Sequence, residues 1–124
     1  MTAARHDLTI DQGADFSLEL TIKESASVKN LTDWYPRAQL RKNKESASAT
    51  AAFTASVSGD VTNGKILLQM PWETTDDITA GVYYYDLELY NVGEGAGADA
   101  TPASILQVLR IMGGQVHVRR EVTR

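Results

Sequence analysis

Strict alternation of apolar and polar residues, seen twice in this chain, constrains its fold more than any other feature. In residues 16–23 every second side chain is apolar: Phe16, Leu18, Leu20 and Ile22. Side chains of a β-strand point alternately to opposite faces, so a period of two puts these four on one buried face. Residues 81–90 repeat the pattern with Tyr83, Tyr85, Leu87 and Leu89. A helix would scatter these residues around its circumference, and we therefore predict two β-strands.

Weaker signals predict the remaining strands and their connections. Further strands are expected over residues 8–10, 37–42, 52–58, 65–70 and 103–119. The last of these should be bent by a glycine bulge at Gly113 and Gly114. The Asn63-Gly64 pair predicts a hairpin turn, because both residues tolerate the positive φ that tight turns need. Polar or glycine-rich composition predicts loops over residues 25–30, 43–50 and 91–102.

Residues 71–78 break the strand pattern and predict one or two helical turns. Pro71 suits a first helical position, acidic residues follow it, and Gly81 is expected to end the segment. About seven or eight short strands with turns between them and one helical crossover are typical of a sandwich. The predicted fold class is therefore all-β, a single immunoglobulin-like β-sandwich.

Length and cysteine content bound the organisation. A chain of 124 residues fits one domain, with a core at residues 5–119 and a C-terminal tail at residues 120–124. The sequence contains no cysteine, which excludes disulfides, thiolate metal ligands and thiol nucleophiles.

Charge and hydropathy exclude two classes of partner. The net charge is −4 and the 12 basic residues are spread along the chain, whereas nucleic-acid binding needs clustered Lys and Arg. No apolar run approaches the ~20 residues of a membrane helix, and the polar start of the chain predicts no signal peptide. We expect neither a nucleic-acid nor a membrane partner.

Three groups of residues are candidates for metal binding or catalysis. His6 and His117 would offer a metal only two ligands, and Asp86 and Glu88 share the solvated face of one strand. Glu73, Asp76 and Asp77 would suit calcium or acid–base catalysis, but acids that favour the dipole at a helix start explain them better. We predict no catalytic residue, no metal site and no cofactor.

Aromatic and basic residues are the candidates for contacts with a partner. Tyrosine and Trp are enriched in interfaces because they bury large areas with few rotatable bonds, and Arg is also enriched there. The candidate interface residues are Trp34, Tyr35, Tyr84, Tyr90, Arg119, Arg120 and Arg124. The alternative for Trp34 and Trp72 is that they cap the core. Aromatic residues of this kind would also suit a sugar-binding platform.

Several segments, in this order, give the whole chain a resemblance to a known group of proteins. They are residues 5–16, 30–34, 37–41, 78–89, 114–118 and 121–124. The chain resembles small tail- and baseplate-associated proteins of tailed bacteriophages. The resemblance covers nearly the full length, although the loop at residues 91–102 is longer than expected for the group.

The resemblance implies a non-enzymatic structural component of the virion, assembled in the host cytoplasm. It would act as an adaptor that binds neighbouring tail, neck, baseplate or fibre proteins in multiple copies within a symmetric assembly. The alternative from another class is a carbohydrate-binding module that contacts glycans on the host surface. That alternative predicts exposed aromatic side chains aligned in a groove.

Overall fold

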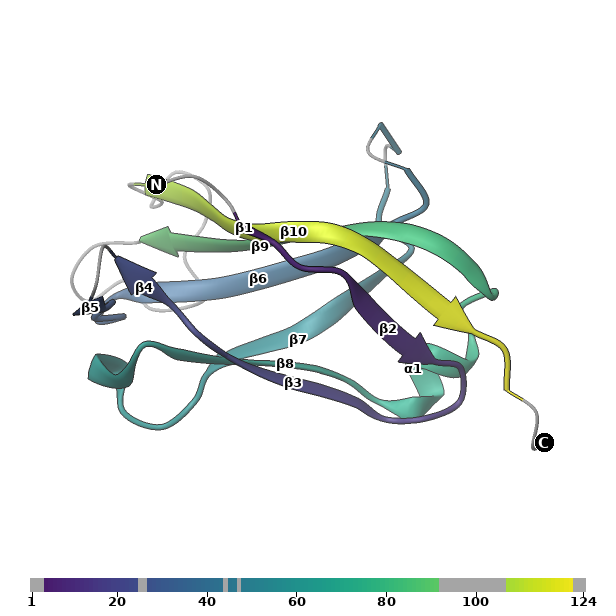
Figure 1. The fold of residues 1–124 in the computed structure, drawn as a ribbon, viewed down its shortest axis with the longest axis horizontal. Coiled ribbons are helices and arrows are strands. Elements are labelled where there is room, and N and C mark those ends of the chain that lie inside the picture. Colours follow the sequence, from purple (N-terminus) through teal and green to yellow (C-terminus); the bar gives the residue numbers. More distant parts are fainter. Residues whose placement is uncertain (1–3, 25–26, 44, 47, 92–106, 122–124) are drawn as a thin grey trace.

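Eight strands follow one another through shared backbone hydrogen bonds in the computed structural model, which describes residues 4–24, 27–43, 45–46, 48–91 and 107–121. These strands are β1 (Ala4–Arg5), β2 (Leu8–Asp11), β3 (Phe16–Thr21), β6 (Trp34–Arg41), β7 (Ala51–Val57), β8 (Lys65–Met70), β9 (Gly81–Asn91) and β10 (Gln107–Arg119). They form two layers (Figure 1). The first layer contains β10, β9 and β6, with β1 and β2 parallel to β10, and the second contains β8 and β3.

Strand β7 belongs to both layers and closes one side of the sandwich. Its first half pairs with β6, where Phe53 lies opposite Ala38. Its second half pairs with β8, where Val57 lies opposite Ile66. On the other side the two layers end in different strands, β2 and β3, joined by the short turn at residues 12–15.

The predicted inward faces are confirmed. Tyr83, Tyr85, Leu87 and Leu89 of β9 are all buried, as are Ala38 and Leu40 of β6. The inward residues of β3, by contrast, remain half-buried up to Leu20, and only Ile22 beyond the strand is fully buried. The core therefore lies between the layers and is less well covered along β3.

Tyr83 supplies a structural hallmark of the fold. It lies near the start of β9, and its hydroxyl donates to the carbonyl oxygen of Thr79, four residues upstream, at 2.6 Å. This arrangement is the tyrosine corner of immunoglobulin-like domains. The strand order, the shared β7 and this corner identify the chain as an all-β, immunoglobulin-like sandwich, as predicted.

The helix at the β8–β9 connection has the predicted length of one to two turns, but its ends differ from the prediction. Helix α1 (Trp72–Asp76) is capped by Pro71 at its N-cap position, so Pro71 precedes the first helical residue. Gly81 does not end it: Gly81 is the first residue of β9. Ile78 is buried, as expected for a crossover that packs on the core.

Two turn predictions are wrong in detail. The predicted hairpin is confirmed, because β7 and β8 pair antiparallel and Gly64 has a φ of 65°. Its turn is longer than the Asn63-Gly64 pair: residues 58–64 join the strands through a 3-10 helix (Val61–Asn63). The segment predicted as a loop at residues 25–30 includes part of a small antiparallel pair, β4 (Lys23–Glu24) with β5 (Ser27–Val28).

The bulge in the last strand is displaced from the glycines. The register of β10 against β9 shifts between Arg110 and Met112, so Ile111 is the extra residue. Ile111 and Met112 are both buried, and the shift lets two successive apolar side chains enter the core. The loop predicted at residues 91–102 and the strand start predicted at residues 103–106 lie outside the described residues, apart from Asn91. No helix in the described part of the chain is long and apolar enough to cross a membrane.

Candidate functional site

A hollow of about 920 Å³ marks the outer face of the first layer. Strand β1 borders it on one side and β6 on the other, and β10 and β9 form its floor. We call it the outer-face groove. Its charged and aromatic lining residues are Arg5, Arg37, Arg41, Arg110, Asp86, Glu88, Tyr84 and Tyr85.

Two adjacent glycines of β10, Gly113 and Gly114, form part of the groove floor. Gly113 lies opposite Asp86, which lines the groove, and as a glycine it places no side chain on this face. A Cβ atom on Gly114 would lie 2.7 Å from Asp7 Oδ1 and 2.8 Å from the carbonyl oxygen of His6. Glycine therefore both opens the groove and lets the N-terminal strands approach β10 closely.

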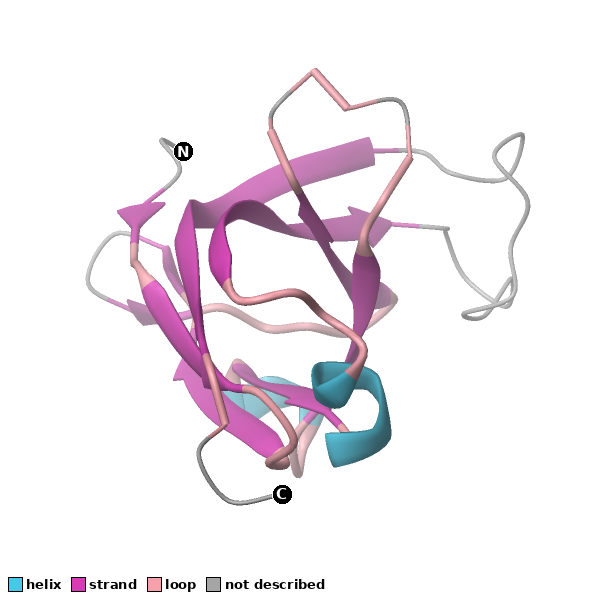
Figure 2. Cartoon of the chain, turned by 90° about the vertical axis from the view of Figure 1, so that its right-hand side faces the viewer, coloured by secondary structure: helices cyan, strands magenta, loops and turns pink. Residues whose placement is uncertain are grey.

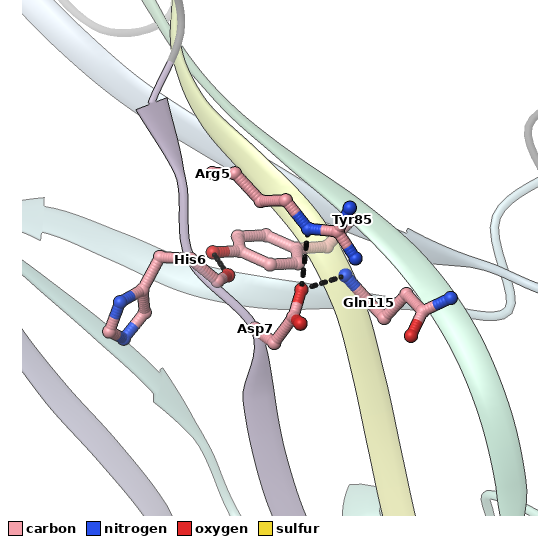
Figure 3. Close-up of polar contacts among 5 residues, drawn as sticks. All are labelled: Arg5, His6, Asp7, Tyr85 and Gln115. Atoms are coloured by element: carbon pink, nitrogen blue, oxygen red, sulfur yellow. Dashed lines mark hydrogen bonds and ion pairs between the residues drawn. The ribbon is translucent and has the colours of Figure 1, made fainter.

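Polar contacts fix the N-terminal segment at the edge of the groove (Figure 3). The backbone N–H of Gln115 donates to Asp7 Oδ1 at 2.9 Å, and Arg5 Nε lies 3.4 Å from the same oxygen. The Tyr85 hydroxyl donates to the carbonyl oxygen of His6. The Gln115 hydrogen bond, more than the Arg5 charge, lowers the pKa of Asp7, so the carboxylate stays ionised. Burial raises the pKa of Tyr85, which keeps its proton as a donor.

Cations outnumber anions on the walls of the groove. Glu88 pairs with Arg37 Nε at 2.9 Å, and Asp86 pairs with Arg110 at 3.3 Å. Arg41 instead donates to the neutral acceptors Gln39 Oε1 and the Ser46 carbonyl, at 3.0 and 2.9 Å. Among the described residues no carboxylate pairs with Arg41. Four arginines and two carboxylates line a groove in a protein whose net charge is −4.

The predicted tyrosines lie on this outer face. Tyr84 lines the groove itself. Tyr35 and Tyr90 lie further along β6 and β9, with their ring centroids 5.8 Å apart and tilted by 34°. The Arg37 guanidinium lies 5.1 Å from the centre of the Tyr90 ring, which joins this pair to the groove wall.

The two tryptophans have different environments. Trp34 is partly buried and packs against the core, and Lys29 Nζ lies 4.6 Å from its ring centre, so it caps the core. Trp72 does not cap the core: it is 53% exposed. Its place at the start of α1, after Pro71, directs it away from the apolar interior.

The predicted basic tail is divided by the structure. Arg119 is the last residue of β10, and its Nε lies 2.7 Å from Asp11 Oδ1 of β2. Arg120 follows the strand and is exposed. Arg124 lies outside the described residues. Of the three, Arg119 therefore already has a partner within the chain.

The groups weighed for catalysis or metal binding do not converge. The described residues contain no cluster of three or more His, Cys, Asp or Glu side chains that would hold a metal ion, and His6 and His117 are exposed. Asp86 and Glu88 each pair with an arginine. Glu73 lies in the first turn of α1 as expected, but Asp76 and Asp77 lie at its end, where the helix dipole does not favour acids.

Sequence patterns did not single out most of the groove. Arg37 and Arg41 were recognised as strand residues, and the glycines were predicted to form a bulge. The alternation in β6 does place Arg37, Gln39 and Arg41 on one face. Which of them meet Glu88 and Asp86 depends on the register between strands that are far apart in the sequence.

No family model and no curated protein matches the chain. Solved structures with distant similarity include the second Ig domain of the mouse polymeric immunoglobulin receptor, at 15% identity and a TM-score of 0.38 over 97% of this chain and 99% of that one. The extracellular domain of a voltage-gated sodium channel β4 subunit matches at 11% identity and a TM-score of 0.38, over 98% of this chain and 97% of that one. AggA, a fimbrial subunit of Escherichia coli, matches at 8% identity and a TM-score of 0.39, over 91% of this chain and 89% of that one. Similarities this distant indicate no ligand, partner or activity for this chain.

Proposed function

We propose that this immunoglobulin-like domain is a non-enzymatic structural component of a tailed-phage virion, where it joins neighbouring tail, neck, baseplate or fibre proteins. The observation that carries the binding role is the outer-face groove. Its lining contains arginine and tyrosine, two residue types that are enriched among energetically important interface residues. The phage setting rests on the resemblance of the ordered sequence segments.

A protein partner suits the groove better than a sugar does. A carbohydrate platform would present several exposed rings in line, but Tyr84 is the one outward-facing aromatic residue in the lining. Tyr35 and Tyr90 pack against each other beside the groove. The lining is mostly guanidinium and carboxylate, which suits a charged protein surface.

Replacement of Tyr84 and Tyr90 by Ser tests the proposal in the phage that encodes the chain. We expect a folded protein, judged by circular dichroism, but a loss of tenfold or more in assembled particles, because truncated aromatic anchors weaken interfaces strongly. The matched control is Val82→Ser, which removes an exposed side chain from the same strand outside the groove. Normal assembly of the double variant would contradict the proposal, as would glycan binding by the isolated domain that is lost with Tyr84.

A further inference from the structure

Trp72 is the large apolar side chain that the fold leaves most exposed within the described residues. Its exposed fraction is 53%, against 39–43% for the exposed valines. Its backbone N–H donates to Asp15 Oδ1 at 2.7 Å, which fixes the position of the residue. A rigidly placed, exposed indole is typical of an interface anchor.

The surroundings of Trp72 are acidic. Glu73, Asp76 and Asp77 of the α1 segment are exposed, and no ion pair among the described residues involves them. Asp76 and Glu121 border the same small depression as Trp72. We call Trp72 and these carboxylates the α1 corner.

The α1 corner and the outer-face groove have complementary properties. One is a projecting aromatic ring among unpaired carboxylates, and the other is a hollow with an excess of guanidinium groups. The volume of about 920 Å³ is ample for an indole and part of its helix. The glycine floor leaves room for a flat ring, and guanidinium groups at the rim attract the π-face of the indole.

We propose that the α1 corner of one copy binds in the outer-face groove of a second copy. Trp72 is the anchor, and Arg41 of the groove pairs with the carboxylates of the α1 corner. Arg41 suits this role because its present acceptors within the chain are uncharged. The inference uses the same groove as the proposed function and names its occupant.

The two surfaces lie on different parts of the molecule, so the contact joins copies head to tail. Figure 2 looks onto the end of the sandwich that carries α1, whereas the groove crosses β1, β10, β9 and β6 on the outer face of the first layer. A contact between unlike surfaces repeats from copy to copy and produces a ring if the rotation closes, or a filament if it does not. Repeated copies of this kind fit a component of a symmetric particle.

Sedimentation velocity of the full chain, from about 10 μM to 1 mM at low ionic strength, tests the contact. We expect wild type to form oligomers larger than dimers, and Trp72→Ala and Arg41→Glu each to weaken self-association tenfold or more. High salt should also weaken it. The matched controls are Val61→Ala, an exposed apolar truncation elsewhere, and Lys23→Glu, the same charge change on β4. Both controls should associate like wild type.

Mixing the two variants identifies the arrangement. Trp72→Ala retains the groove and Arg41→Glu retains the anchor. Each variant alone should therefore show the weakened self-association, while an equimolar mixture forms heterodimers with wild-type strength and nothing larger. Wild type that stays monomeric throughout, or variants that associate like wild type, would overturn the inference. If Arg41→Glu blocks particle assembly while Trp72→Ala does not, the groove binds a different virion protein; that result rejects self-association and leaves the proposed function standing.

Discussion

Tyr83 and Tyr85 are buried side by side on the inner face of β9, and each donates its hydroxyl proton to a backbone carbonyl in another part of the chain. Tyr83 binds Thr79, two residues before its own strand begins. Tyr85 binds His6, 79 residues away, and so attaches the N-terminal segment to the core. The Tyr85 hydroxyl thus links the core packing of β9 to the position of the N-terminal segment, which borders the groove.

We expect Tyr85→Phe to lower the free energy of unfolding by about 1 kcal/mol at pH 7, the usual net value of one hydrogen bond. The raised pKa of Tyr85 means that the folded state keeps this proton longer than the unfolded chain, whose tyrosines titrate near pH 10. Its contribution is complete below that pH and is lost as pH rises above it. Urea unfolding at pH 7 and pH 11 should therefore show a smaller alkaline loss for the variant; equal losses would contradict the prediction.

Asp7 gives the opposite pH dependence. Its pKa is lowered, mainly by the N–H of Gln115, so its contribution to stability is present above the ordinary carboxyl pKa of about 4 and is lost as pH falls below it. Asp7→Asn should therefore reduce the melting temperature at pH 7 and leave it almost unchanged at pH 2. Thermal unfolding of both proteins across that range checks this. A difference in melting temperature that persists at pH 2 would mean that the variant changes stability through the shape of the side chain and not through its charge.

One buried hydroxyl group helps to hold helix α1 in place, beside the Trp72–Asp15 hydrogen bond. Thr75 is fully buried, and its Oγ1 accepts from the Gly13 N–H at 3.1 Å and donates to the Ala14 carbonyl at 2.9 Å. These bonds attach the helix to the turn between β2 and β3. The same contact positions Trp72, three residues earlier.

Thr75→Val keeps the shape of the side chain but removes both hydrogen bonds. We expect a loss of about 1–3 kcal/mol in the free energy of unfolding, because the two backbone groups lose their partner. Thr75→Ser is the matched control: it keeps the hydroxyl and should lie closer to wild type in the same denaturant titration. A serine variant that is less stable than the valine variant would show that the methyl group matters more than the bonds.

The whole sandwich is closed on one side by β7 and ends on the other in β2 and β3. Leu68 of β8 and Leu18 of β3 lie directly opposite each other, yet Leu68 is fully buried and Leu18 only partly. Burial of the same side chain is therefore unequal across one pair of strands, because β7 covers β8 while β3 is the last strand of its layer.

This difference predicts unequal costs of truncation. Leu68→Ala should reduce the free energy of unfolding by about 2–5 kcal/mol, since it leaves a cavity in the closed part of the core. Leu18→Ala should cost markedly less, because the partly exposed site loses less burial and leaves a smaller cavity. Equilibrium unfolding in guanidinium chloride compares the two variants. Equal costs would mean that the β3 side is as well packed as the β7 side.

Much of the architecture was determined by the sequence alone. A period of two is a local property, so the alternation in residues 16–23 and 81–90 placed each side chain on the correct face before any partner strand was known. The bounds of β8 and the absence of any βαβ pattern followed in the same way. The candidate tyrosines were found because alternation also tells which residues face outward.

The tertiary structure alone decided what those outward residues meet. The register of β6 and β10 against β9 places both Arg37 and Arg110 opposite Glu88. Arg37 pairs with Glu88, and Arg110 forms its ion pair with Asp86, which lies diagonally across β9. The bulge lies at Ile111 and not at the glycines, because long-range packing of two apolar side chains fixed the shift. Gly113 and Gly114 are then left to form the groove floor. These relations depend on contacts between residues distant in the sequence, which no local pattern encodes.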